Sequence, residues 1–513
     1  MVMGKYVIGV DIGTTSTKTA VYDTSGQVLN RHFVGYPLKA PTPGAAVQNP
    51  DQIFQAVITS VEQAIAKSEI KQSEIICLSF SAAMHSLIVV DDGGKALTPS
   101  ITWADNRSAD WADKLKQDYN GQEIYRRTGT PIHPMSPLAK LMWLRYSKGE
   151  LWQQAAKFIS IKEYIFWHLF QEYVVDYSIA SATGLFNLQN LDWDQEALKI
   201  TGIQPSQLSQ LVSTTHIIKG IQCQYAEQMG INAHTPVVIG ASDGVLANLG
   251  VGAIAPGIVA VTVGTSGAVR ATITKPQTDP KGRLFCYALT ENYWVIGGAV
   301  NNGGITLRWV KDQLADAEID TAKLLGQDPY DMLTAIADTI PPGSEGLIFH
   351  PYLSGERSPL WDANARGSFF GLALHHHKGH LIRAVLEGVV YNLYLVLEAL
   401  SAIVGEVKSV KAAGGFARSS LWRQMLADIF AREVSIPESY ESSCLGAAIL
   451  GLYAMGEIQE LTHAEQINSN VYQHQPIADN VAVYQKILPI YSRLLDSFKH
   501  EYAAIASLQQ ELR

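Results

Sequence analysis

A strand–turn–strand motif that occurs twice constrains the fold of this chain more than any other feature of its sequence. Residues 7–23 (VIGVDIGTTSTKTAVYD) have the pattern of two strands joined by a tight turn of glycine and hydroxyl residues. Residues 258–274 (IVAVTVGTSGAVRATIT) repeat this plan about 250 residues later. The Gly- and Pro-rich residues 250–257 lie where the two halves meet. We therefore predict two domains, residues 1–250 and 251–513.

The composition suits two large folded domains. The chain has 513 residues, of which 47% are hydrophobic and 17% charged, so it can bury two cores and is too apolar to be disordered. Strands alternate with helical stretches in the first half, and the second half ends in long helices. In residues 380–400 the apolar side chains recur at helical spacing. The sequence predicts an α/β protein with a core helix at that position.

Charge and cysteine content narrow the choice of partners. There are 39 Lys and Arg against 48 Asp and Glu, and a net charge of −9 provides no basic face for nucleic acid or an anionic membrane. The 4 cysteines lack CxxC spacing, which indicates buried thiols in a reducing compartment. No signal-peptide pattern is seen. The uncharged residues 244–263 have the length of a membrane span, but glycines and a proline interrupt them, which favours a helix, a turn and a buried strand. We expect a soluble, cytoplasmic protein without a nucleic-acid or membrane partner.

The two turns carry residue types that suit phosphate. After the strand that contains Asp11, successive backbone N–H groups and hydroxyls can receive phosphate oxygens, and the Asp11 carboxylate can hold Mg²⁺ through waters. One such turn alone is more typical of an ordinary hairpin. The matching Gly-Thr-Ser turn at Thr265 favours a pair of turns that grips the two ends of a triphosphate. Glycines at 297–304 and 414–415 would let the backbone approach a flat ligand such as adenine, although each is also consistent with a plain turn.

Two chemistries compete at residues 237–245 (VVIGASDGV). As GxSxG the segment is a nucleophile elbow with Ser242 as the attacking group. Alternatively, Asp243 at the end of a strand can take a proton from a substrate hydroxyl, or it merely begins the next helix. Only the role of Asp243 as a base also accounts for the two phosphate turns, and we prefer it.

Polar and aromatic residues suited to a polyhydroxylated ligand follow two other strands. Met84-His85 lies at one strand end, and residues 103–107 (WADNR) follow the other. Trp103 can cover C–H groups, Asp105 can bind hydroxyls in fork fashion, and Arg107 can meet an anion, although a surface loop anchored by one Trp is equally typical. The histidines 375–377 and 380 resemble a metal cluster. Consecutive side chains diverge and no carboxylate is suitably spaced, which favours a solvated loop.

Together these residues resemble the FGGY family of carbohydrate kinases. Residues 367–387 (GSFFGLALHHHKGHLIRAVLE) fit the family's C-terminal signature, and residues 135–144 (MSPLAKLMWL) are similar to the N-terminal one, which departs at Tyr146. The likeness runs from Asp11 to about Gly451. It implies an α/β fold of two actin-like ATPase (ribonuclease H-like) domains flanking a catalytic cleft, with ATP and Mg²⁺ as cofactors.

The resemblance also implies roles for single residues. By their positions in the family motifs, Asp243 is similar to the catalytic base and Asp11 to the magnesium-site aspartate. The residues that match the nucleotide site are Thr14, Thr15, Ser16, Lys18, Thr265, Gly304, Arg308, Gly415 and Ser419. The residues expected to bind the sugar are Met84, His85, Trp103, Asp105, Arg107 and Met135, together with Asp243.

The substrate is indicated by short runs within this family. Residues 81–87 (SAAMHSL), 103–108 (WADNRS) and 129–135 (GTPIHPM) look like gluconokinases. Xylulokinases usually carry Gln before Met-His and Asn after Trp, where this chain has Ala83 and Ala104. The implied activity is phosphorylation of D-gluconate by ATP, and the substrate carboxylate would meet a cation among Arg107, Lys140 and His133.

Other activities stay open at this point. A xylulokinase or another FGGY sugar or polyol kinase is the main alternative. A serine hydrolase built on Ser242, or an actin-like ATPase without a sugar substrate, is more distant. The family offers both monomers and dimers, so a homodimer is also open.

Overall fold

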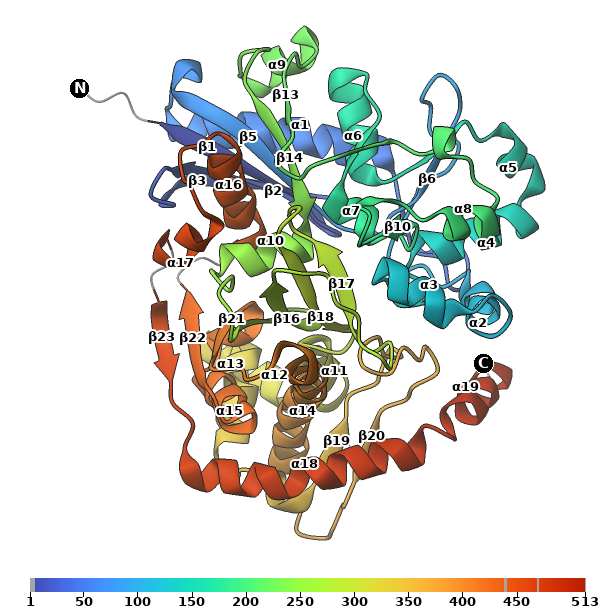
Figure 1. The fold of residues 1–513 in the computed structure, drawn as a ribbon. Helices are drawn as coiled ribbons and strands as arrows, with labels where there is room; N and C mark the ends of the chain where they lie inside the picture. The colour runs from blue at the N-terminus through green and yellow to red at the C-terminus, as the bar shows by residue number, and fades with distance from the viewer. Residues whose placement is uncertain (1–4, 438–440, 468–469, 513) are drawn as a thin grey trace. The chain divides into compact units, whose positions relative to one another are not determined.

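A computed structural model describes residues 5–437, 441–467 and 470–512 (Figure 1). The chain forms two units, and neither is continuous in sequence. The first unit comprises Met1–Ala255, Thr272–Ile296 and Glu441–Asn468, and the second comprises Pro256–Ala271, Gly297–Tyr440 and Ser469–Arg513. The predicted boundary at residue 250 divides the sequence into two continuous halves, whereas each compact unit combines several segments of the chain. The predicted domain division therefore stays a prediction.

A six-stranded mixed sheet forms the centre of the first unit, in the order β13-β14-β5-β1-β2-β3. The predicted hairpin is present: β1 pairs with β2 in antiparallel fashion, and β1, β5 and β14 run parallel to one another. The strands of this sheet are β1 (Tyr6–Ile12), β2 (Ser16–Asp23), β3 (Val28–Gly35), β5 (Ile75–Ala82), β13 (Ile217–Ile218) and β14 (Val237–Ser242).

Helices cover both faces of this sheet. Successive residues of a strand point to opposite faces. Ile8 and Val10 of β1 pack in one core cluster with residues of α1 (Pro50–Ser68). Gly9, between them, faces α16 (Ser442–Ala454), where a side-chain β-carbon at residue 9 would lie 2.2 Å from the carbonyl oxygen of Cys444. Helix α16 also packs along α10 (Asp243–Gly250).

A second hydrophobic cluster of the first unit surrounds α4 (Pro137–Ser147), which begins with the N-terminal signature. The remaining helices of this unit are α2 (Ala109–Asp118), α3 (Gly121–Thr128), α5 (Gly149–Gln154), α6 (Ile161–Phe170), α7 (Tyr177–Ser181), α8 (Gln195–Thr201), α9 (Cys223–Met229) and α17 (Ala464–Ile467). Its short strands are β4 (Val47–Gln48), β6 (Ile88–Val90), β7 (Ser100–Ile101), β8 (Lys157–Ile159), β9 (Val174–Asp176), β10 (Phe186–Asn187), β11 (Asp192–Trp193), β12 (Gln210–Val212) and β17 (Phe285–Ala288).

The second unit repeats the plan of the first. Its hairpin, β15 (Ile258–Val263) and β16 (Gly267–Ile273), is antiparallel, and β15 pairs in parallel with β21 (Ser409–Ala413). The sheet continues through β22 (Glu433–Pro437) to β23 (Asn470–His474), while residues 297–300 of β18 (Trp294–Val300) lie on the other side of β16. The order β2-β1-β5 thus corresponds to β16-β15-β21, as the repeated motif predicts.

The predicted core helix is α14 (Lys378–Val404), and the C-terminal signature is anchored at its start. Glu387 accepts hydrogen bonds from Arg383 Nε (2.8 Å), Gly343 N (2.9 Å), Ser344 Oγ (2.8 Å) and Tyr484 Oη (2.9 Å). Arg383 and Glu387 are buried, so this part of the signature has a structural role: it ties α14 to the turn at Gly343 and Ser344 and to Tyr484.

The second unit contains further helices and a short hairpin besides α14. Its helices are α11 (Ile305–Leu314), α12 (Asp316–Leu325), α13 (Pro329–Asp338), α15 (Ser420–Phe430), α18 (Ala478–Phe498) and α19 (Tyr502–Glu511), and two short strands, β19 (Ile348–His350) and β20 (Ser368–Phe370), form a hairpin. Among the described residues, α14 is the one helix with the length and hydropathy of a membrane span, and most of its apolar window is buried within the protein. That burial is typical of a core helix.

Candidate active site

Three neighbouring parallel strands of the first unit end at one edge of its sheet. The registers place Asp11 of β1 beside Ser81 of β5, and Ser242 of β14 beside Ala82 of β5. Asp243, which follows Ser242, therefore lies at the same edge as Asp11. The carboxyl ends of parallel strands are the usual ligand-binding edge of an α/β sheet. The structure thus places at this edge the two carboxylates that the sequence predicts as base and magnesium-site residue.

Asp11 has the surroundings of a carboxylate that can hold Mg²⁺. Ser81 Oγ donates a hydrogen bond of 2.7 Å to Asp11 Oδ1. Burial raises the pKa of Asp11, although this hydrogen bond and the charge of Lys18 oppose the rise. Lys18 itself pairs with Glu441, at 2.7 Å. Mg²⁺ binds one or two protein carboxylates and keeps several waters, so a single carboxylate beside hydroxyl groups fits this ion.

Ser242 and Asp243 differ in accessibility. Ser242 is fully buried, and its hydroxyl lies 2.9 Å from Ser178 Oγ. A nucleophile elbow requires an exposed hydroxyl, so this environment excludes the hydrolase interpretation of Ser242. Asp243 is partly exposed as the first residue of α10, and its Oδ1 accepts a hydrogen bond of 2.7 Å from Gly244 N.

A small cavity lies next to this edge within the first unit. Its volume is about 10 Å³, roughly that of one water. Trp103 Nε1 donates a hydrogen bond of 3.0 Å to Thr14 Oγ1, which joins the predicted sugar cluster to the first phosphate turn. Sequence analysis missed Gln48, whose Nε2 donates to the Thr14 carbonyl oxygen at 2.7 Å, because no motif surrounds it. The cavity is lined by Ile12, Gly13, Thr14, Gln48, Ile53, Ala83, Met84, Ser86, Ser100, Thr102, Trp103 and Ile161.

Lys140 joins two of the predicted sugar-binding segments. Its Nζ donates hydrogen bonds to the carbonyl oxygens of His85 (2.6 Å) and Met135 (2.7 Å). His85 has a left-handed backbone with φ of +68°, which is uncommon outside glycine, and this contact helps to hold it. Burial lowers the pKa of Lys140 to about 7, while the charge of Asp105 opposes that shift. The side chain of Lys140 is fully buried and positions these segments.

Arg107 is the more accessible cation. Its Nε and Nη2 bind Asp105 at 2.8–3.0 Å, its guanidinium lies 4.6 Å from the ring centre of Trp143, and 25% of its side chain is exposed. Among the described residues, none hydrogen-bonds to its Nη1. Asp105 is buried and also accepts Ala46 N at 2.9 Å. It therefore fixes the direction of Arg107, and the structure does not place its carboxylate as an open hydroxyl-binding group.

The predicted nucleotide residues of the second unit gather at the end of β15. Gly304 N donates to the Gly264 carbonyl oxygen (2.7 Å), and Gly303 N and Ile305 N donate to that of Thr265 (3.2 and 3.1 Å). A β-carbon at residue 303 would lie 2.5 Å from the Ser266 carbonyl oxygen, so the glycine allows this close approach. Thr265 and Gly304 are brought together in one place.

The Gly-Gly turn reaches the same strand. Gly414 has a φ of +110°, and a β-carbon there would lie 2.4 Å from the Val263 carbonyl oxygen, while nothing lies within 4 Å of such an atom at Gly415. Ser419 caps α15 and accepts a hydrogen bond of 3.3 Å from Trp422 N. Arg308 lies on α11, one turn after Gly304. The open backbone at Gly415 fits the predicted contact with a flat ligand, whereas the Ser419 hydroxyl has a structural partner.

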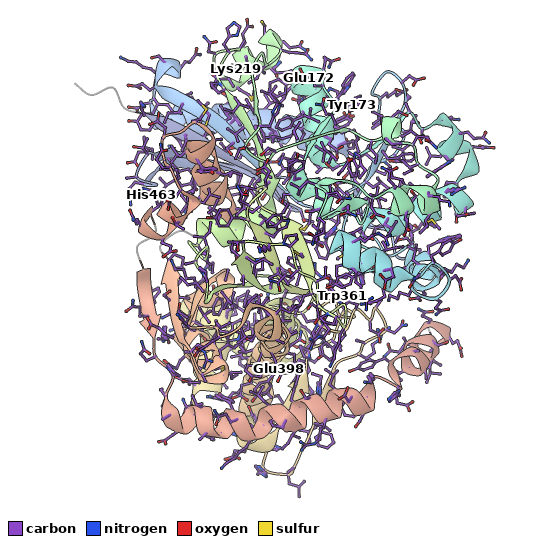
Figure 2. The ribbon with its side chains drawn as sticks, viewed as in Figure 1. Glu172, Tyr173, Lys219, Trp361, Glu398 and His463 are labelled. Carbon is purple, nitrogen blue, oxygen red and sulfur yellow. The ribbon has the colours of Figure 1, made fainter. Side chains whose placement is uncertain are left out.

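A buried carboxylate that the sequence did not reveal supports the residue 301–304 turn. Glu356 is fully buried and accepts hydrogen bonds from Asn301 N, Asn302 Nδ2 (3.1 Å) and Asn392 Nδ2 (2.8 Å). Trp361, which is labelled in Figure 2, lies in the loop that follows. Its backbone has a φ of +50°. Burial raises the pKa of Glu356 to about 7, against the effect of the donors from Asn301 and Asn302. Because Glu356 lies far from the glycines in sequence, no local motif links them.

Glu356 should give the second unit a measurable pH dependence. A carboxyl whose pKa is higher in the folded than in the unfolded state favours folding below its ordinary value near 4.5, and this contribution is lost as the pH rises through about 7. We expect the free energy of unfolding of the wild type, relative to Glu356→Gln, to fall by about 2.5 kcal/mol between pH 5 and pH 8. Urea unfolding of both proteins across this range measures it, and a constant difference would contradict the assignment.

The histidines 375, 376, 377 and 380 do have a carboxylate neighbour, contrary to the prediction. Glu345, from the turn before β19, places its Oε2 3.3 Å from Nε2 of both His375 and His380, and ligand atoms of Glu345, His375 and His376 lie within 4.8 Å of one another. The other ring nitrogens argue against a metal. Nδ1 of His376, His377 and His380 each accepts a backbone N–H, whereas a metal-bound imidazole normally donates from its second nitrogen. The cluster therefore caps the N-terminus of α14.

Comparisons with known proteins agree with this architecture. The family model for the N-terminal domain of the FGGY family of carbohydrate kinases matches residues 6–250. The model for the C-terminal domain of the same family matches residues 259–455. A solved structure titled as gluconate kinase from Lactobacillus acidophilus superposes with a TM-score of 0.92, at 39% identity over 98% of this chain and 100% of that one. The two-unit fold is that of a carbohydrate phosphotransferase, and the predicted actin-like fold class is confirmed.

The chain belongs to the FGGY family of carbohydrate kinases, as the sequence motifs indicate. Among curated relatives, the gluconokinase of Bacillus subtilis is 56% identical over 511 residues, which are 99% of each chain. That of Bacillus licheniformis is 55% identical over the same length. A xylulose kinase from Staphylococcus epidermidis is 28% identical over 98% of this chain and 99% of its own.

Proposed function

We propose that this kinase transfers the γ-phosphoryl group of ATP to the terminal hydroxyl of D-gluconate and releases 6-phosphogluconate and ADP. The full-length identity of 56% with a protein named gluconokinase carries the proposal. The curated relatives named xylulose kinase are far more distant, at 27–29% identity, whereas a solved structure named xylulose kinase from Lactobacillus acidophilus is 39% identical, as is the gluconate kinase structure. We also propose a cytoplasmic location.

In the proposed reaction Asp243 acts as the base. Its carboxylate accepts the proton of the attacking hydroxyl, whose oxygen forms a bond to the γ-phosphorus as the bond to the ADP oxygen breaks. The turn of Thr14, Thr15 and Ser16, and the turn of Thr265, orient the phosphates through backbone N–H groups and hydroxyls. Most of the rate enhancement of such a reaction comes from positioning and charge stabilisation. Mg²⁺, which Asp11 would hold, neutralises phosphate charge when bound.

Arg107 is the cation that we assign to the substrate carboxylate. Lys140 is buried against two carbonyl oxygens, whereas Arg107 is partly exposed and its Nη1 is not used by any described residue. A guanidinium nitrogen in this position can donate a charge-assisted hydrogen bond to a carboxylate oxygen.

Replacing Arg107 by glutamine should raise the KM for gluconate by about 10–100-fold, because a hydrogen bond to a charged group contributes about 1.5–3 kcal/mol. The amide can still donate to the buried Asp105. Steady-state kinetics with gluconate and a neutral acceptor such as xylulose measure the effect. An equal rise of KM for both acceptors would show that Arg107 does not select the carboxylate.

The substrate proposal is tested by ADP release with Mg-ATP in the presence of gluconate, xylulose, ribulose, glycerol or no sugar. We expect turnover with gluconate to exceed that with each other acceptor by at least about 10²-fold. Among these acceptors only gluconate has a carboxylate, which Arg107 would bind. Preference for another acceptor would keep the kinase and reject gluconate. A rate that no acceptor changes would reject the assignment of a sugar substrate.

A further inference from the structure

A buried polar cluster lies directly behind Asp243 in the first unit, and the proposed chemistry does not use it. It consists of Lys162 on α6, Asp176 at the end of β9, Ser178 on α7 and Ser242 at the end of β14, and none of the four is more than 2% exposed. Lys162 Nζ donates to Asp176 Oδ2 at 2.8 Å, so the centre of the cluster is an ion pair without solvent. Burial lowers the pKa of Lys162, and the charge of Asp176 opposes that shift.

The cluster holds the backbone that leads into Asp243. Lys162 Nζ also donates to the Ala241 carbonyl oxygen at 3.3 Å. Ser178 Oγ accepts a hydrogen bond of 3.1 Å from Ser242 N and lies 2.9 Å from Ser242 Oγ. Ala241 is therefore held through its carbonyl oxygen, and Ser242 through its backbone amide and its hydroxyl.

Asp176 places Ser178 for this contact. Its Oδ2 faces Lys162, and its Oδ1 accepts a hydrogen bond of 2.9 Å from Ile179 N as the N-cap of α7. The cap fixes the first turn of α7, on which Ser178 lies. One carboxylate thus links the lysine that binds Ala241 to the serine that binds Ser242.

The strand itself needs this support. The pairing of β14 with β5 is irregular between Val238 and Ala241, and Gly240 in the gap has a φ of +73°. An interrupted ladder does not by itself fix the direction of the residues that follow it. A buried ion pair adds little net stability compared with apolar residues of the same shape, so geometric control is a better reason for its presence here.

We infer that Lys162, Asp176 and Ser178 are positioning residues of phosphoryl transfer: they set the backbone at Ala241 and Ser242 and thereby aim the Asp243 carboxylate. The inference rests on the proposed role of Asp243 as the base. A displacement of a reacting group by about 1 Å can cost about 10²-fold in rate, so a cluster that does not touch substrate can still control turnover.

Ser178→Ala is the variant that tests this, because it removes the contacts with Ser242 and leaves no buried charge unpaired. We expect kcat to fall by about 10-fold or more, with the KM values for gluconate and ATP within about 2-fold of the wild type. Ser181→Ala is the matched control. Ser181 is fully buried on the same helix, but its hydroxyl binds the Ser178 carbonyl oxygen (2.8 Å) and Ala288 N (3.0 Å) instead of β14. A similar loss of kcat in both variants would overturn the inference.

A double-mutant cycle separates positioning from a general loss of structure. In an Asp243→Ala background the base is absent, so Ser178→Ala should lower the residual kcat no further. If Ser178→Ala lowers kcat by the same factor with and without Asp243, the cluster does not act through the base and the inference fails. If Asp243→Ala alone keeps near-full turnover, Asp243 is not the base. That single-variant result rejects the proposed function of Asp243 whatever the Ser178 variant does.

Asp176→Asn provides a second variant of the same cluster. The amide oxygen can still cap α7, while the charge that faces Lys162 is removed. We expect the same pattern as for Ser178→Ala, a lower kcat with little change in KM. A folded Asp176→Asn protein with wild-type kcat would overturn the role of the ion pair.

Discussion

Replacing Asp243 by alanine should lower kcat with gluconate and ATP by about 10²–10⁴-fold, because a general base typically contributes that factor. The residue lies at the carboxyl end of β14, at the same sheet edge as Asp11, and it is partly exposed where Ser242 is buried. Initial rates of ADP formation measure the loss. KM values should change little, since the proposed proton transfer belongs to the transition state.

A control for this variant comes from another helix. Asp331 lies in the first turn of α13 and is exposed, so Asp331→Ala removes a comparable favourable charge at a helix N-terminus without touching the site. It should keep wild-type turnover. Near-full turnover of Asp243→Ala would refute the role of this carboxylate as base.

The second large effect is on stability. Helices α10 and α16 of the first unit approach through glycines: a β-carbon at Gly446 would lie 1.9 Å from the Leu246 carbonyl oxygen, and one at Gly250 would lie 1.8 Å from that of Ser442. Backbone atoms cannot move aside without shifting a whole helix. We expect Gly446→Ala to destabilise the first unit by about 3 kcal/mol or more and to lower its melting temperature by roughly 5 °C or more.

Calorimetry and kinetics together test this prediction. Because Asp243 is the first residue of α10, a shift of that helix should also reduce kcat. Gly149→Ala is the control, since nothing lies within 4 Å of a β-carbon there and alanine favours helix α5. A melting temperature of Gly446→Ala within about 1 °C of the wild type would show that the helices separate easily.

Local patterns predicted much of this architecture. Strand alternation and the repeated Gly-Thr turn indicated both hairpins, and the helical spacing in residues 380–400 indicated α14, because these signals depend on near neighbours. The position of Asp243 after a strand was also visible in the sequence. Family motifs added residues that local chemistry alone left ambiguous, such as Gly415.

Contacts between distant segments were outside the reach of sequence patterns. Gln48 meets Thr14 from another strand, Glu345 meets the histidines from a turn that precedes them by about 30 residues, and Glu356 meets Asn302 from a separate loop. The cation for the substrate carboxylate could not be chosen from sequence, since only burial and partners distinguish Lys140 from Arg107. Ser178 carries no motif at all.

The place of α16 in the first unit has a consequence for how the protein is made. Ser443 donates a hydrogen bond to the Asp243 carbonyl oxygen across 200 residues of sequence. On the ribosome, the sheet of the first unit therefore emerges well before the helix that covers its second face, by about 10–40 s at about 5–20 residues per second. During that interval the sheet face that contains Gly9 lacks its covering helix on the nascent chain. A premature stop before residue 441 would therefore leave the N-terminal sheet uncovered as well as remove the C-terminal residues.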